Sequence, residues 1–77
     1  MFIKLTATST TSKDGDVYIS IGDIQAIAPD MDSKEPRTMV YTGRGNIVVK
    51  ESVMAILKAI SEPVKSGTLY ITPKSTE

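Results

Sequence analysis

The chain has 77 residues, of which 40% are hydrophobic and 23% are charged, and its nine Lys and Arg balance nine Asp and Glu. This length and composition predict one small domain spanning 1–77, with no room for a second core. The absence of Cys and His excludes disulfides, thiolate metal sites, thiol nucleophiles and the most common general base.

No apolar stretch approaches the roughly 20 residues of a membrane-spanning helix. Residues 1–12 have neither the basic start nor the apolar core of a signal peptide. We therefore expect a cytoplasmic protein that makes no membrane contact.

The first elements form a predicted β-hairpin. Residues 3–7 alternate apolar with polar side chains, which is the period of a half-buried strand. Asp14 and Gly15 favour a tight turn, because Gly accepts the positive φ that such turns demand. Residues 17–21 repeat the alternation with β-branched side chains and give the second strand.

The hairpin is followed by a break and a loop. Gly22 and Asp23 end the second strand, and the spacing of Ile24 and Ile27 predicts a single helical turn that leads into a short strand. The polar segment "PDMDSKEP", residues 29–36, is bounded by two prolines and predicts an exposed loop.

A second hairpin leads into a helix. Residues 37–42 resume the strand pattern, "GRGN" predicts a turn, and residues 47–49 then fold back as an antiparallel partner. The apolar spacing next becomes helical and predicts a helix at about 51–61, with Ser52 as its N-cap and Pro63 as its end. The stripe expected to cover the sheet consists of Val53, Ile56, Leu57 and Ile60.

The chain closes with a predicted edge strand. Leu69 and Ile71 alternate with Thr68, Tyr70 and Thr72, and the segment is bounded by Gly67 and Pro73. A flexible tail is expected at about 73–77. The predicted class is therefore α+β, mostly β. We expect a small antiparallel sheet or a partly open barrel of five to six short strands, capped by one helix.

The sequence offers few groups for chemistry. Three Ser and Lys pairs are neighbours, but such pairs are ordinary in loops: Ser12 with Lys13, Ser33 with Lys34, and Ser66 with Lys65. The acidic residues Asp30, Asp32 and Glu35 lack the Gly and the distant Glu of an EF-hand loop. We expect no enzyme, no catalytic residue, no cofactor and no metal site.

Charge is distributed unevenly along the chain. Residues 1–36 hold three Lys against six Asp and Glu, and residues 37–77 hold six Lys and Arg against three Glu. The second predicted hairpin carries the basic residues together with an aromatic ring, a combination typical of barrels that bind single-stranded nucleic acid. The candidate contacts are Arg37, Tyr41, Arg44 and Lys50.

Three segments carry a resemblance to a known family: "IKLT" at residues 3–6, "DIQAI" at residues 23–27 and "TGRGNIVVKESVMAILKAI" at residues 42–60. They resemble the FlbD-type (SwrD-like) small flagellar proteins over about residues 2–61. The resemblance implies an opening strand, a Gly turn, a V-V-K-E-S junction and a short helix, and it implies no catalytic residues. A weaker similarity links the middle of the chain to the core of LytTR-type DNA-binding domains.

These observations lead to two functional hypotheses. The first is a non-enzymatic bacterial or phage interaction and regulatory protein that acts through protein–protein contacts. The alternative is a nucleic-acid-binding small barrel that uses the basic hairpin around residues 37–50. Because a small sheet without disulfides leaves an open edge, we also expect a homodimer formed through Leu69, Tyr70 and Ile71.

Overall fold

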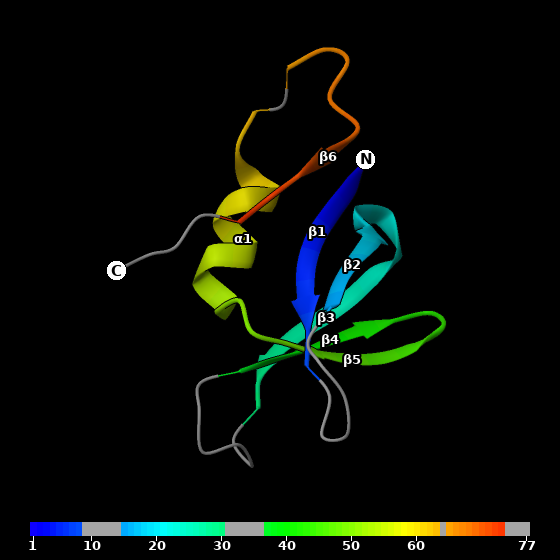
Figure 1. Cartoon of the computed structure of the whole chain (residues 1–77), viewed down its shortest axis with the longest axis vertical. Coiled ribbons are helices and arrows are strands. Elements are labelled where there is room, and N and C mark those ends of the chain that lie inside the picture. Colours follow the sequence, from blue (N-terminus) through cyan, green and yellow to red (C-terminus); the bar gives the residue numbers. More distant parts are fainter. Residues whose placement is uncertain (9–14, 31–36, 64, 74–77) are drawn as a thin grey trace.

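A computed structural model (Figure 1) describes residues 1–8, 15–30, 37–63 and 65–73. The predicted class is confirmed: six strands form one sheet that does not close into a barrel, and one helix packs on it. In chain order the elements are β1 (Phe2–Ala7), β2 (Gly15–Ser20), the 3₁₀ turn η1 (Ile21–Asp23), β3 (Ile24–Pro29), β4 (Thr38–Thr42), β5 (Gly45–Val49), α1 (Val53–Ser61) and β6 (Tyr70–Ile71).

The sheet order is β2-β1-β5-β4-β3, with β6 added beside β1. All pairs are antiparallel except β1 with β6, which is parallel. One side of β1 pairs with β2 along its whole length. Its other side is shared, because β6 lies beside Phe2 and Ile3 while β5 meets Ala7.

Both predicted hairpins form. β1 and β2 pair in register from Phe2 opposite Ser20 to Ala7 opposite Gly15. β4 and β5 meet at a tight turn in which the Thr42 hydroxyl donates to the Gly45 carbonyl at 2.8 Å and accepts the Arg44 N–H at 3.1 Å. Gly45 has a φ of 142°, a conformation that a side chain would strain.

The helical turn lies earlier than the sequence suggested. It occupies Ile21–Asp23, and the segment expected to contain it is the strand β3. A register shift between Ile24 and Ala26 interrupts the pairing of β3 with β4. The bulge lets the chain turn out of η1 and still pair with β4 further along.

Helix α1 begins and ends as capping predicts. The Ser52 hydroxyl accepts the Ala55 N–H at 3.1 Å, and Ser52 itself is extended with φ −73° and ψ 158°. The helix therefore begins at Val53, directly after the predicted N-cap and within two residues of the expected start at about residue 51. The helix ends at Ser61, before Pro63.

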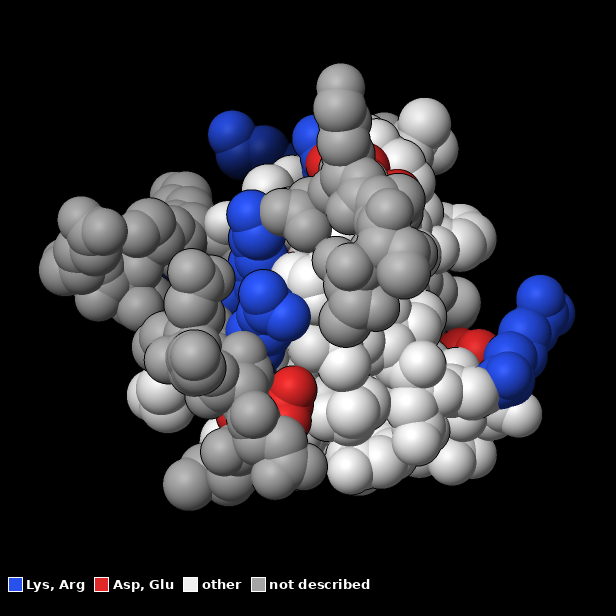
Figure 2. All heavy atoms as spheres, turned by 60° about the horizontal axis from the view of Figure 1, so that its bottom comes forward, with Lys and Arg blue, Asp and Glu red and all other residues white. Residues whose placement is uncertain are grey.

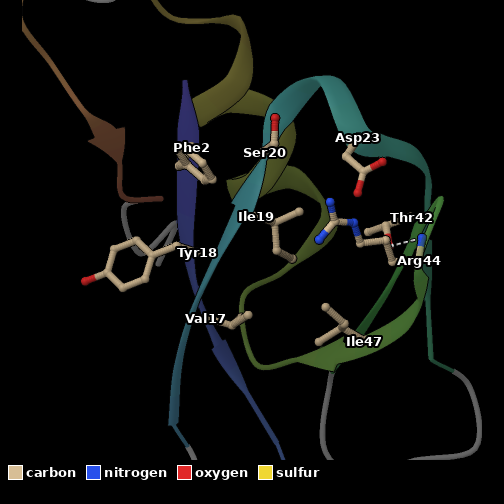
Figure 3. A pocket seen from close by; sticks show the side chains of 9 residues that line it. All are labelled: Phe2, Val17, Tyr18, Ile19, Ser20, Asp23, Thr42, Arg44 and Ile47. Atoms are coloured by element: carbon tan, nitrogen blue, oxygen red, sulfur yellow. Dashed lines mark hydrogen bonds between the residues drawn. The ribbon is translucent and has the colours of Figure 1, made fainter.

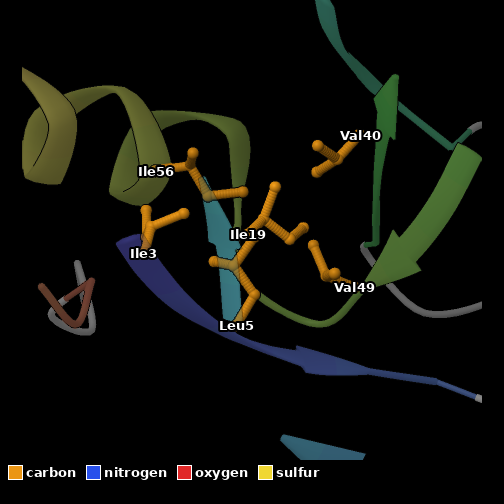
Figure 4. Close-up of a cluster of buried hydrophobic side chains, with 6 residues drawn as sticks. All are labelled: Ile3, Leu5, Ile19, Val40, Val49 and Ile56. Carbon is orange, nitrogen blue, oxygen red and sulfur yellow. The ribbon is translucent and has the colours of Figure 1, made fainter. Parts of the chain in front are cut away.

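The core is entirely aliphatic and lies between α1 and the sheet (Figure 4). Ile56 supplies the helix contribution, as predicted. Leu57, expected on the same stripe, is 48% exposed, and Ala55 is buried instead, because the helix is rotated about its axis so that Ile56 points to the centre of the sheet. The buried hydrophobic cluster consists of Ile3, Leu5, Ile19, Val40, Val49 and Ile56.

Several sequence predictions fall outside the described residues. They concern the first turn at residues 9–14, most of the polar loop at 31–36 and the tail at 74–77. The Ser and Lys pairs in the first two segments, and two of the three acidic candidates for a cation, lie there as well: Ser12, Lys13, Ser33, Lys34, Asp32 and Glu35.

Candidate functional site

The four aromatic side chains of this protein all lie at the surface. Their exposed fractions are 47% for Phe2, 50% for Tyr18, 36% for Tyr41 and 43% for Tyr70. Aromatic rings are large apolar groups that commonly dominate the energetics of cores and interfaces. Here the core uses aliphatic residues, and the rings remain on the outside.

Three of these rings gather on the outer face of β1, β2 and β6. Phe2 lies opposite Tyr70 in the register of β1 and β6, and the rings of Tyr18 and Tyr70 meet edge to face with centroids 5.2 Å apart. We call these three residues, Phe2, Tyr18 and Tyr70, the aromatic face. Leu69, which is 79% exposed, directly precedes β6.

The alternation of the strands explains why the aromatic face points outward. Ile3 on β1 and Ile19 on β2 are buried, so their even-numbered neighbours take the opposite side of the sheet. This period was visible in the sequence. The parallel placement of β6 beside β1, which brings Tyr70 to the same surface, was not.

An ion pair borders the aromatic face. Lys4 and Asp16 lie on the same outer side, with 3.6 Å between Nζ and Oδ2. Because both side chains are partly solvated, the pair adds little stability.

A groove of about 500 Å³ runs along β2 (Figure 3). Its floor is formed by Val17, Ile19 and Ile47, which point inward from β2 and β5. Arg44 and Asp23 also line the groove, and within the described part of the chain no ion pair forms between them. The remaining lining residues are Phe2, Tyr18, Ser20 and Thr42.

A smaller hollow of about 290 Å³ lies between β3 and α1. Leu57 and Ile60 line this hollow from α1. All of its lining residues are uncharged; the others are Ile21, Ile24, Gln25, Ala26 and Ile27.

The predicted basic hairpin is split by the structure. Arg37 precedes β4 and Lys50 follows β5, so the pairing of Thr38 with Val49 brings these two ends together. Arg44 lies in the turn at the other end of the hairpin, about 17 Å away at 3.3 Å per strand residue. On the face in Figure 2, Lys and Arg lie toward both sides, and the described residues between them are largely uncharged.

The predicted self-association edge is engaged within its own chain. Tyr70 and Ile71 pair with β1, and the Leu69 carbonyl accepts the Phe2 N–H at 3.3 Å. Ile71 packs against the core, whereas Leu69 and Tyr70 are exposed. This segment thus completes the sheet, and its Tyr70 contributes to the aromatic face.

Chemical groups that could hold a metal are sparse. Within the described residues, no three acidic side chains come together as a ligand set. The one described helix has nine residues, and none of the described segments forms a helix long and apolar enough to cross a bilayer.

The fold therefore defines a small α+β domain, mostly β, with an exposed aromatic face and an adjoining groove. Comparison of the chain with protein-family models, curated protein sequences and solved structures finds no match. The resemblance to FlbD-type proteins stays a prediction.

Proposed function

We propose that this protein is a non-enzymatic interaction module, of bacterial or phage origin, that binds a protein partner through the aromatic face. The observation that carries the proposal is the gathering of Phe2, Tyr18 and Tyr70 at the surface while the core is aliphatic. Contiguous exposed apolar surface is characteristic of interaction sites, and aromatic residues are enriched there.

The pairing of the rings supports a contact surface of defined shape. Tyr18 and Tyr70 hold each other at an interplanar angle of 83° from strands on opposite sides of β1. Rings that are already ordered lose little conformational entropy when a partner covers them. Tyrosine also offers a hydroxyl at the rim of such a contact.

The charge arrangement favours a protein over a nucleic acid. A platform that stacks bases needs cations beside the rings to neutralise the phosphates. Among the described residues, Lys4 borders the aromatic face and is paired with Asp16. Arg37 and Arg44 belong to the β4–β5 hairpin, where one ring, Tyr41, is available.

The proposal is tested by affinity capture with matched tyrosine variants. Tagged wild-type protein, Tyr70→Ser and Tyr41→Ser are used as baits in extracts of the cells that encode the protein. Tyr41 is the control because its exposure is similar but it lies outside the aromatic face. We expect Tyr41→Ser to retain the wild-type partner and Tyr70→Ser to lose it.

Two further arms keep the test decisive. Phe2→Ser removes a second ring of the same face, which lies opposite Tyr70 in the register of β1 and β6, and it should also weaken capture. Circular dichroism establishes that each bait is folded. Equal capture by all variants, or enzymatic turnover that depends on a polar residue of this chain, would overturn the proposal.

A further inference from the structure

The two ends of the sheet differ in how they are protected. At one end, β3 carries a register shift between Ile24 and Ala26 and closes with Pro29, which has no N–H to donate. Bulges and prolines are the means by which natural sheets discourage the addition of another strand. At the other end, β2 pairs with β1 through six consecutive residues with no shift.

The pairing pattern identifies the backbone groups of β2 that have no strand partner in the described part of the chain. The Ile21 N–H donates to the Met1 carbonyl at 3.0 Å, continuing the register of β1 and β2 by one step. Because hydrogen-bonded pairs alternate along an antiparallel ladder, odd-numbered residues of β2 face β1. The backbone groups of Asp16, Tyr18 and Ser20 therefore point to the free side, where the groove of about 500 Å³ begins.

We infer that the free edge of β2 pairs with β2 of a second copy of this chain, antiparallel and about a two-fold axis at Tyr18. In this register Tyr18 lies opposite Tyr18 of the second copy, and Asp16 lies opposite Ser20. The exposed groups of the two edges then form about six backbone hydrogen bonds. This inference goes beyond the proposed function, since it needs no other protein.

Charge and apolar surface favour this register. The two Asp16 carboxylates lie at opposite ends of the new ladder, about 13 Å apart, and each faces a neutral Ser20. The two Tyr18 rings lie side by side on the outer surface, so the aromatic faces of both copies become continuous. β6 is a poorer edge because the strand is two residues long and one of its sides already pairs with β1.

Disulfide trapping tests the register directly, because the chain contains no Cys. At the two-fold axis the Cα atoms of residue 18 are about 5.5 Å apart, within the range that a disulfide spans. We expect Tyr18→Cys to form a covalent dimer under mild oxidation at least about tenfold faster than Tyr41→Cys, because pairing raises the effective thiol concentration. Asp16→Cys, whose thiols lie apart in this register, should react as slowly as Tyr41→Cys.

Ser20→Pro tests the edge without disturbing the monomer. Ser20 has φ −62°, which matches proline, and its side chain makes no capping hydrogen bond to η1. The substitution removes an N–H that points to the free side. Light scattering at about 100 μM should give a dimer mass for the wild type and a monomer mass for Ser20→Pro.

A wild-type monomer mass at that concentration, a dimer that survives Ser20→Pro, or equal trapping of Tyr18→Cys and Tyr41→Cys would overturn the inference. The results of these self-association experiments do not depend on whether the aromatic face captures a different protein. Tyr70→Ser leaves every free backbone group of β2 in place, so failure of self-association and failure of the proposed function are distinguished.

Discussion

The carboxylate of Glu51 accepts two hydrogen bonds from Thr6, one from its backbone N–H at 2.8 Å and one from its hydroxyl at 2.9 Å. On β1, Thr6 lies between Phe2 and Ile3, which pair with β6, and Ala7, which pairs with β5. The side chain thus supplies the acceptor that a neighbouring strand would otherwise provide. The Glu51 carbonyl also accepts the hydroxyl of the buried Thr38 at 2.6 Å, so this residue joins β1, β4 and the start of α1.

Glu51→Ala should lower the free energy of unfolding by about 1–2 kcal/mol, because the half-buried Thr6 N–H and hydroxyl lose their acceptor. Urea denaturation measures the change. Glu62→Ala is the control, since Glu62 is exposed at the end of α1 and its loss should change stability by no more than about 0.5 kcal/mol. Equal effects of the two variants would show that the Thr6 contact contributes nothing.

Ile56→Ala should cost about 2–5 kcal/mol, because it removes the fully buried helix side chain at the centre of the core. Leu57→Ala is the matched neighbour on the same helix. It should cost no more than about 1 kcal/mol, since nearly half of Leu57 is already in solvent. Melting curves that rank Leu57→Ala as the more damaging variant would contradict the observed rotation of α1.

Ser52→Ala should cost about 1 kcal/mol, because the Ala55 N–H loses the hydroxyl that caps the helix. Ser61→Ala serves for comparison. Its hydroxyl donates to the Lys58 carbonyl at an exposed position, where a water molecule can take the place of the hydroxyl as donor. Thermal unfolding should therefore give a lower melting temperature for Ser52→Ala than for Ser61→Ala. Identical melting temperatures would argue against the cap.

The rival function predicts binding to single-stranded nucleic acid. We expect no electrophoretic shift at about 100 mM salt, because the described cations are divided between the ends of the β4–β5 hairpin. A shift that weakens steeply with salt and disappears when Arg37 and Arg44 are changed to Glu would instead establish the rival.

The sequence predicted much of the local structure, because local signals determine it. Strand alternation and Gly-containing turns located both hairpins, and Ser52 marked the helix start. The rotation of α1 that exposes Leu57 depends on how the helix packs across the sheet, which periodicity alone does not specify. The turn η1 was misplaced because Ile24 and Ile27 fit a helical spacing as well as the bulged strand that forms.

The candidate site was less accessible to prediction. Tyr70 was correctly assigned to a strand, yet its contact with Tyr18 depends on a parallel pairing between the two ends of the described chain. Conversely, Arg37, Arg44 and Lys50 are close in sequence but not all close in space, because a hairpin separates its turn from its ends. Sequence proximity is a weak guide to surface clusters on extended strands.

The most direct test of the central claim is photo-cross-linking in the cells that encode the protein. A photoreactive phenylalanine analogue replaces Tyr70 in one variant and Tyr41 in another, and covalent adducts are resolved by mass. We predict that the analogue at Tyr70 captures a protein partner and that the analogue at Tyr41 does not. Adducts formed at Tyr41 with none at Tyr70 would contradict the assignment of the aromatic face as the binding surface.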